Sequence, residues 1–142
     1  MLRKRWGSRL NAAALATLVI VALAPRIVRA EEVPIASGTR TNGKGHVDIL
    51  SLKRTEGDTL TLRIAVSNDG NRSLDINLGL ARLIDLVGRR YYFPGLTSPR
   101  CEAASGERTI CWAIYAAPNP GIKSVNVIFD EDFGLIPVPI GN

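Results

Sequence analysis

The clearest structural signal in this 142-residue chain is the segment Thr59-Leu60-Thr61-Leu62-Arg63-Ile64-Ala65-Val66-Ser67. Its large apolar side chains recur at every second position, and the positions between them are mostly polar. Successive side chains of a β-strand point to opposite faces, so this period of two is typical of a strand buried on one face. We therefore expect residues 59–67 to form a half-buried strand.

Further short extended segments lie on both sides of this strand, separated by residues that favour turns. The preceding segment, 47–52, switches its alternation between Ile49 and Leu50, which indicates a β-bulge. Later segments are expected at 73–80, 83–86, 90–93, 109–116, 122–129 and 136–140. Two prolines restrict the last of these to a sheet edge. No long helical period follows residue 45, so the pattern predicts an all-β, antiparallel sandwich of seven or eight short strands.

Three motifs in this region are distinctive: the strand and turn of residues 58–70, the hairpin of residues 83–91, and the turn Ser105-Gly106-Glu107 before the strand that carries Trp112. Together they resemble bacterial secreted immunoglobulin-like domains, the telokin-like group that includes small secreted immunoprotective antigens. The resemblance covers roughly residues 46–140 and implies an immunoglobulin-like antiparallel sandwich. Members of that group are typically secreted and non-enzymatic, so the resemblance also implies that this protein is not an enzyme.

Residues 1–30 have the three parts of a cleavable signal peptide. The first nine residues carry four basic side chains, an apolar run extends from Leu10 to Ala24, and the small Ala30 precedes the expected cut. The run is about 15 residues long, whereas a membrane-spanning helix needs roughly 20. An uncleaved N-terminal anchor is the alternative. We expect a periplasmic or secreted protein without an integral membrane span after cleavage, with a flexible lead-in at 31–45 and one domain at 46–142.

Removal of the leader changes the charge balance. The whole chain has 18 Lys and Arg against 13 Asp and Glu, a net charge of +5. Six of the basic residues and none of the acidic ones precede the expected cut, which leaves 12 basic and 13 acidic residues. A nucleic-acid-binding surface needs a clustered excess of positive charge. We therefore expect no nucleic acid among the partners.

Cys101 and Cys111 are the only two cysteines, and an even number in an exported chain predicts a disulfide. A free or redox-active pair is the alternative. His46 is the only histidine, so neither a zinc site nor a Ser-His-Asp triad is expected, and the sequence indicates no cofactor. The acidic triplet Asp130-Glu131-Asp132 leaves calcium binding as an open alternative to a solvated loop.

The hairpin Arg89-Arg90-Tyr91-Tyr92 is the most suggestive surface feature, because Arg and Tyr are enriched where proteins bind partners. Arg100 and Arg108, around the expected disulfide loop, complete the candidate partner-binding set. The alternative to a binding site is an ordinary strand, in which one tyrosine packs inward and the arginines are solvated at a turn. We expect a non-enzymatic binding or adaptor domain, monomeric or weakly oligomeric, that contacts a protein or cell-envelope component. The second hypothesis is a structural subunit of an envelope or surface assembly, joined through open strand edges.

Overall fold

The computed structural model describes residues 32–142, so the expected signal peptide lies outside the described residues. The segment at 59–67 lies in strand β3 (Thr59–Asn68), inside a four-stranded sheet of order β1-β2-β3-β8. Its other strands are β1 (Ala36–Thr39), β2 (Gly45–Thr55) and β8 (Arg108–Ala116). A second four-stranded sheet, β10-β9-β5-β6, consists of β10 (Ile136–Pro139), β9 (Ser124–Ile128), β5 (Arg82–Ile84) and β6 (Arg90–Tyr91). The remaining pair is β4 (Leu74–Asn77) with β7 (Arg100–Ala103).

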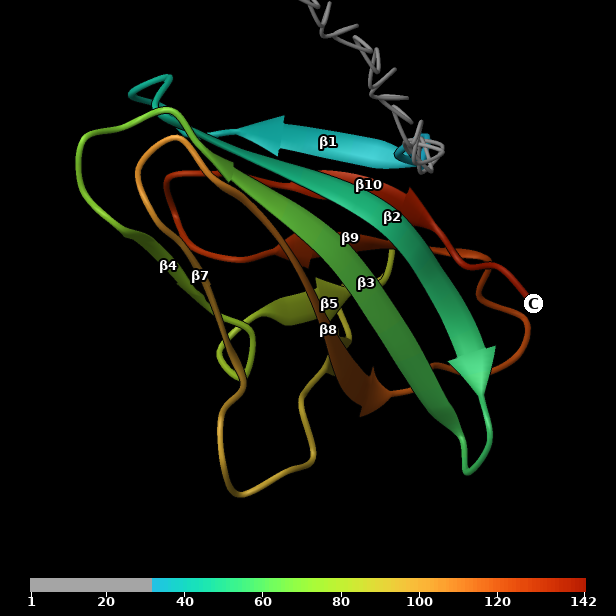
Figure 1. Ribbon diagram of the computed structural model, residues 1–142. Coiled ribbons are helices and arrows are strands. Elements are labelled where there is room, and N and C mark those ends of the chain that lie inside the picture. The colour runs from blue at the N-terminus through green and yellow to red at the C-terminus, as the bar shows by residue number, and fades with distance from the viewer. Residues whose placement is uncertain (1–31) are drawn as a thin grey trace, which may run out of the picture. The chain divides into compact units, whose positions relative to one another are not determined.

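The described part of the chain is thus all-β, and the named strands pair antiparallel throughout. Figure 1 shows the β1-β2-β3-β8 sheet lying over β10, β9 and β5, an arrangement that fits a β-sandwich. One buried core joins the layers, with Leu62 and Ile64 of β3 and Val127 of β9 fully buried. Tyr115 of β8 is also fully buried and donates its hydroxyl to the backbone oxygen of Leu78 at 2.6 Å.

The alternation of the central strands is confirmed. Leu60, Leu62 and Ile64 are fully buried, and the register of β2 against β3 shifts between Ile49 and Ser51, where the bulge was predicted. Strand β10 lies at the edge of its sheet, as its prolines require. A tight turn joins β2 to β3, with Gly57 and Asp58 at φ of 73° and 53°.

The described residues contain ten strands rather than seven or eight, because two short strands lie in segments expected to be irregular. Strand β1 lies within the expected flexible lead-in, and β7 within the stretch between Pro94 and Glu107. Both are four residues long. Strand β1 pairs with the longer β2, and β7 pairs with β4, whose apolar side chains alternate. The strand expected at 73–80 is shorter than predicted and ends at Asn77. Leu80 lies in the turn that follows and is 69% exposed.

The predicted disulfide is present. Cys101 of β7 bonds to Cys111 of β8, with Cα atoms 5.8 Å apart. It therefore joins the two-stranded sheet to the edge strand of the first four-stranded sheet. Across residues 32–142, no helix has the length and apolar character needed to cross a membrane.

Candidate functional site

The candidate site is built on the turn between β5 and β6, which the buried carboxylate of Asp85 holds from inside. Its Oδ1 accepts the backbone N–H groups of Val87 and Arg89 at 3.0 and 2.9 Å, and its Oδ2 accepts the Tyr91 hydroxyl at 2.8 Å. Backbone bonds of 3.0 Å from Asp85 N to Arg89 O and from Gly88 N to Asp85 O close the turn. Gly88 has a φ of 85°, which costs glycine little. One carboxylate therefore fixes the conformation of the whole turn.

The pKa values of Asp85 and Tyr91 move in opposite directions. Burial alone would raise the pKa of Asp85, but hydrogen bonds from Arg89 N, the Tyr91 hydroxyl and Val87 N outweigh it and hold this pKa below its ordinary value. The pKa of Tyr91 is raised by burial, and further by its hydrogen bond to Asp85 and the charge of that group. At neutral pH the pair is therefore a charged acceptor with a neutral phenol donor.

The outer side of this turn exposes apolar and cationic groups together. Leu86 is 83% exposed and Val87 76%, at the tip of the hairpin. Arg89 and Arg90 follow immediately, are exposed, and form no ion pair with any residue between 32 and 142. Exposed apolar side chains beside unpaired arginines are a combination typical of binding surfaces.

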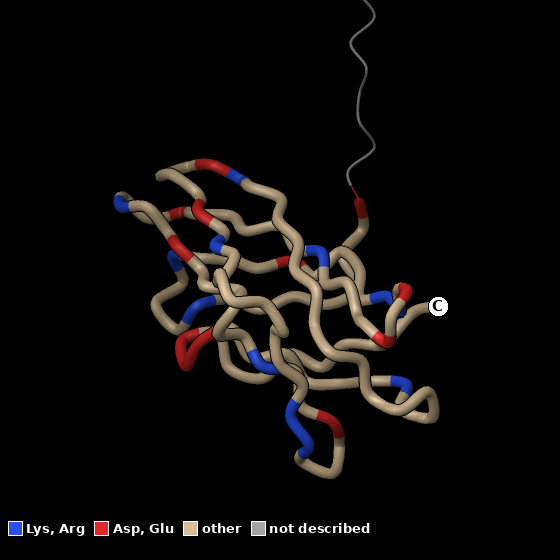
Figure 2. The backbone as a smooth tube through the Cα atoms, turned by 90° about the horizontal axis from the view of Figure 1, so that it is seen from below, with Lys and Arg blue, Asp and Glu red and all other residues tan. Residues whose placement is uncertain are grey.

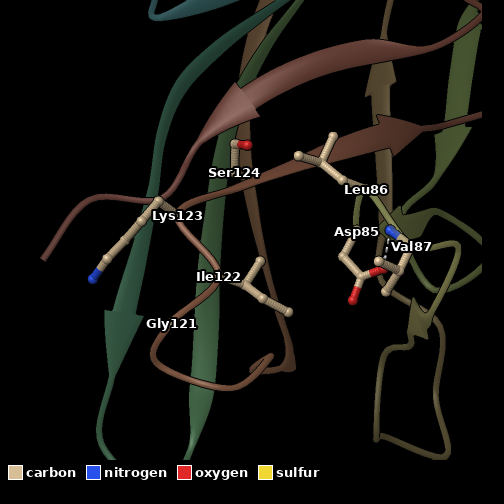
Figure 3. A pocket seen from close by; sticks show the side chains of 7 residues that line it. All are labelled: Asp85, Leu86, Val87, Gly121, Ile122, Lys123 and Ser124. Atoms are coloured by element: carbon tan, nitrogen blue, oxygen red, sulfur yellow. Dashed lines mark hydrogen bonds between the residues drawn. The ribbon is translucent and has the colours of Figure 1, made fainter.

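A groove of about 340 Å³ lies beside the turn. Its lining comes from two segments, the turn itself and the residues leading into β9: Asp85, Leu86, Val87, Gly121, Ile122, Lys123 and Ser124. Figure 3 shows the Ile122 side chain pointing toward the turn and the Lys123 side chain pointing away from it. The second wall is anchored by Arg54, whose Nη2 donates to the backbone oxygens of Asn119 at 3.0 Å and Ile122 at 3.2 Å. The groove thus has two walls that are each held by hydrogen bonds.

Four of the six predicted partner-binding residues lie on this hairpin: Arg89, Arg90, Tyr91 and Tyr92. Tyr91 is half-buried and engaged with Asp85, whereas Tyr92 is 52% exposed and its backbone oxygen accepts Ala116 N at 3.1 Å. The sequence did not predict the opposite wall at Ile122, which lies thirty residues after Tyr92. Alternation and turn residues carry no signal for such a long-range pairing.

Arg100 and Arg108, the other two predicted residues, lie on different sheets and are bound to carboxylates. Arg100 of β7 forms a two-pronged ion pair with Asp75 of β4, with Nε 2.9 and 3.1 Å from the two carboxylate oxygens. Arg108 of β8 donates to Asp48 of β2 at 2.7 Å. These contacts tie neighbouring strands together, so both guanidinium groups have a structural role.

Asp48 is the centre of a polar cluster on the outer face of the first sheet. It accepts hydrogen bonds from Ser37 at 2.8 Å and from Arg108, and its Oδ1 lies 2.7 Å from Nε2 of His46. Burial alone would raise the pKa of Asp48, but these three partners outweigh it, and its pKa lies below the ordinary value. Nδ1 of His46 lies 3.0 Å from the Thr39 hydroxyl, so the histidine links β1 to β2.

The edge strand β8 presents an apolar outer face. Ile110 and Trp112 are 53% and 63% exposed, and they lie opposite Ala65 and Arg63 of β3. Alternation in the sequence puts Ile110, Trp112 and Ile114 on one face of the strand. The opposite face carries Ala113 and Tyr115, which are buried. Because both faces of β8 are apolar, alternation alone does not show which one is buried. The disulfide at Cys111 belongs to the inner face.

The acidic loop before β10, Asp130-Glu131-Asp132, forms ion pairs with Arg40. Asp132 lies 2.6 Å from Nη2 of Arg40, and Asp130 lies 4.0 Å from the same atom. Oδ1 of Asp130 also accepts the backbone N–H groups of Asp132 and Phe133. Within residues 32–142, no group of three or more His, Cys, Asp and Glu side chains is placed to hold a metal ion. Figure 2 shows Lys and Arg interspersed with Asp and Glu along the described chain.

Comparison with protein-family models, with curated proteins and with solved structures found no match for this chain. The function of this chain is therefore inferred from the geometry of the described residues.

Proposed function

We propose that this protein is an exported, non-enzymatic binding or adaptor domain of immunoglobulin-like type that contacts a protein or cell-envelope partner. The observation that carries the proposal is the β5–β6 hairpin, where exposed Leu86 and Val87 lie near Arg89 and Arg90 beside the groove. Both arginines are exposed and form no ion pair with the described residues. Loops at the end of a rigid β-scaffold are the usual place for recognition. The hydrogen bonds of Asp85 support the proposal, because a turn fixed before binding loses less conformational entropy when a partner is bound.

Localisation and fold type are part of the same proposal. The disulfide between Cys101 and Cys111 fits an oxidising compartment outside the cytoplasm. The antiparallel layers of short strands, together with the motifs that resemble the telokin-like group, support an immunoglobulin-like sandwich.

The test is affinity capture from an envelope extract, with chemical cross-linking and quantitative mass spectrometry. The variant Leu86→Ala/Arg89→Ala/Arg90→Ala removes the tip without touching the Asp85 carboxylate. Lys53→Ala/Leu135→Ala, which removes one exposed cation and one exposed apolar side chain away from the hairpin, is the control. We expect the wild type and the control to capture the same partner, and the tip variant to lose it. Equal capture by all three proteins would remove the hairpin from the proposed site.

A second candidate function, a structural subunit of an envelope or surface assembly, is favoured by the free edge of β8. Ladder hydrogen bonds in an antiparallel pair alternate between the two sides of a strand. Since Ala116 N bonds to Tyr92 O, away from β3, the backbone groups of Ile110 and Trp112 also point away from β3. No hydrogen bond to them comes from the described residues.

Light scattering after size-exclusion chromatography tests this second candidate. Assembly through β8 predicts a mass above that of one chain at high concentration, and Ile110→Lys should return it to one chain. Leu135→Lys, at a similarly exposed apolar position in the loop before β10, is the control that should leave the mass unchanged. A wild-type monomer at every concentration would exclude self-assembly through this edge.

A further inference from the structure

A second cavity, distinct from the groove beside the hairpin, lies where the β1–β2 and β3–β4 loops meet. Figure 1 shows these two loops close together at one end of the sheets. The two loops approach closely, since a Cβ placed on Gly70 would lie 3.6 Å from the backbone oxygen of Lys44. The cavity has a volume of about 250 Å³ and is lined by Arg40, Asn42, Lys44, Asn68, Gly70, Asn71, Arg72, Ser73 and Leu74.

The β3–β4 wall of this cavity is held in place by one buried amide. Asn68 is 2% exposed, and its Nδ2 donates to the backbone oxygens of Arg72 at 2.7 Å and Ala103 at 2.9 Å. Its Oδ1 accepts Gly70 N at 2.9 Å, and the Ser105 hydroxyl donates to Gly70 O at 2.6 Å. Asn68 thus holds the backbone of the loop at Gly70 and Arg72 and ties it to β7. The backbone of Arg72 is therefore in place at the cavity before any ligand binds.

The β1–β2 wall is fixed in a similar way. Backbone bonds of 2.8 Å join Arg40 N to Gly45 O and Gly43 N to Arg40 O, and Oδ1 of Asn42 accepts Lys44 N at 2.9 Å. Gly43 has a φ of 70°, the left-handed conformation that this tight turn requires. The wall therefore carries Arg40 and Lys44 on a short loop closed by its own hydrogen bonds.

The lining is cationic and rich in hydrogen-bond donors. It contains three basic residues and no acidic one, and Lys44 and Arg72 form no ion pair within the described residues. Arg40 is anchored through Nη2 to Asp132, but its Nε is buried and has no hydrogen-bond partner. A buried N–H without an acceptor costs free energy. Cationic side chains with spare donors, carried on loops whose backbone is held by hydrogen bonds, match the acceptor oxygens of a phosphate or a carboxylate.

We infer that this cavity is a binding site for a small oxyanion, either free or as the charged group of a sugar-sized molecule. Arg72 and Lys44 supply the charge from opposite walls, and Arg40 supplies a donor already oriented by Asp132. A volume of about 250 Å³ falls below the usual range for drug-sized ligands, which is consistent with a ligand of one ring or less. The site shares no lining residue with the groove at the β5–β6 hairpin, so the inference is independent of the proposed function.

The test is a titration of the isotope-labelled protein, followed by the chemical shifts of its backbone amides. The probes are inorganic phosphate, glucose 1-phosphate and glucuronate, with uncharged glucose as the blank and ionic strength held constant with chloride. We expect saturable shifts confined to residues 40–45 and 68–74. Saturation by phosphate alone identifies the free anion as ligand, and tighter binding of either sugar derivative identifies the charged sugar.

Two double variants, each of which removes two cations, separate this site from general charge effects. Lys44→Ala/Arg72→Ala should weaken anion binding at least tenfold, and Arg89→Ala/Arg90→Ala should leave it unchanged, with both variants melting near the wild-type temperature. Absence of saturation at millimolar probe would overturn the inference. Equal weakening by the two variants would do the same, because it would show only screening of surface charge.

Discussion

Tyr91 donates its hydroxyl hydrogen to Asp85 at 2.8 Å, and the same carboxylate accepts two backbone N–H groups of the turn that it spans. The side chain that fixes the hairpin therefore lies beneath the residues that we propose for binding. This arrangement separates the stability of the turn from the chemistry of its exposed tip, and the two can be tested independently.

Removal of the Tyr91 hydroxyl should destabilise the protein modestly. Tyr91→Phe deletes one hydrogen bond and keeps the ring, so we expect a loss of about 1 kcal/mol in the free energy of unfolding. Asp85→Ala should cost more, because it leaves two backbone donors and the phenol without their acceptor. Urea denaturation followed by circular dichroism gives both values. If Asp85→Ala cost less than Tyr91→Phe, the described role of the carboxylate would be wrong.

Acid should destabilise the fold through Asp48 and Asp85. Both carboxyl groups have folded-state pKa values below the ordinary value of 3.8. A lowered pKa adds stability that is fully present above the unfolded-state value and is lost as the pH falls through the folded-state value. We therefore expect the urea midpoint to fall steeply below about pH 4. Asp48→Asn should flatten that fall, and a curve identical to wild type would contradict the assignment.

Loss of the disulfide should weaken the fold without abolishing the sheets. The bridge closes a short loop of sequence separation 10, so Cys101→Ala/Cys111→Ala should cost about 2–3 kcal/mol. For a domain of this size that corresponds to a fall in melting temperature of roughly 10 °C. Thermal denaturation of the double variant, and of the wild type with and without reductant, measures it. The double variant itself should not respond to reductant.

Two aromatic residues of β8 should respond very differently to truncation. Trp112 is 63% exposed, so Trp112→Ala should change the free energy of unfolding by about 0.5 kcal/mol or less. Tyr115 is fully buried, so Tyr115→Ala should cost about 3 kcal/mol or more through lost packing and the lost hydrogen bond to Leu78 O. Chemical denaturation of both variants is the measurement. If both variants lost a comparable free energy of unfolding, the assignment of Tyr115 to the inner face and Trp112 to the outer face would be contradicted.

The strands with large alternating side chains could be predicted from the sequence, because period-two burial reflects the geometry of the strand itself. This holds for β3 and for the bulge in β2. Strand β1 has the sequence Ala-Ser-Gly-Thr, without a large apolar residue, and it is a strand because it pairs with β2. Strand β7 also lacks a large apolar side chain, and it is a strand because it pairs with β4 and is bonded through its disulfide to β8.

The candidate site could be predicted only where it is local. The hairpin at Arg89–Tyr92 follows from its turn residues, and the turn just before it, at Asp85, Leu86 and Val87, lines the groove. The partners of Arg100 and Arg108 are 25 and 60 residues away, so a list of exposed arginines could not show that Asp75 and Asp48 bind them. The cavity at Lys44 and Arg72 depends in the same way on two loops that are distant in sequence.

The two edges of the first sheet differ in length, and this difference limits how large any assembly can become. On the β2 side the edge is divided between the four-residue β1 and Gly141, which bonds to Leu52 and Arg54. The nine-residue β8 forms the other edge. Two copies joined β8 to β8 would have only short, interrupted edges left on the outside. Growth by edge pairing would therefore stop at a closed two-fold dimer and would not continue into a fibre.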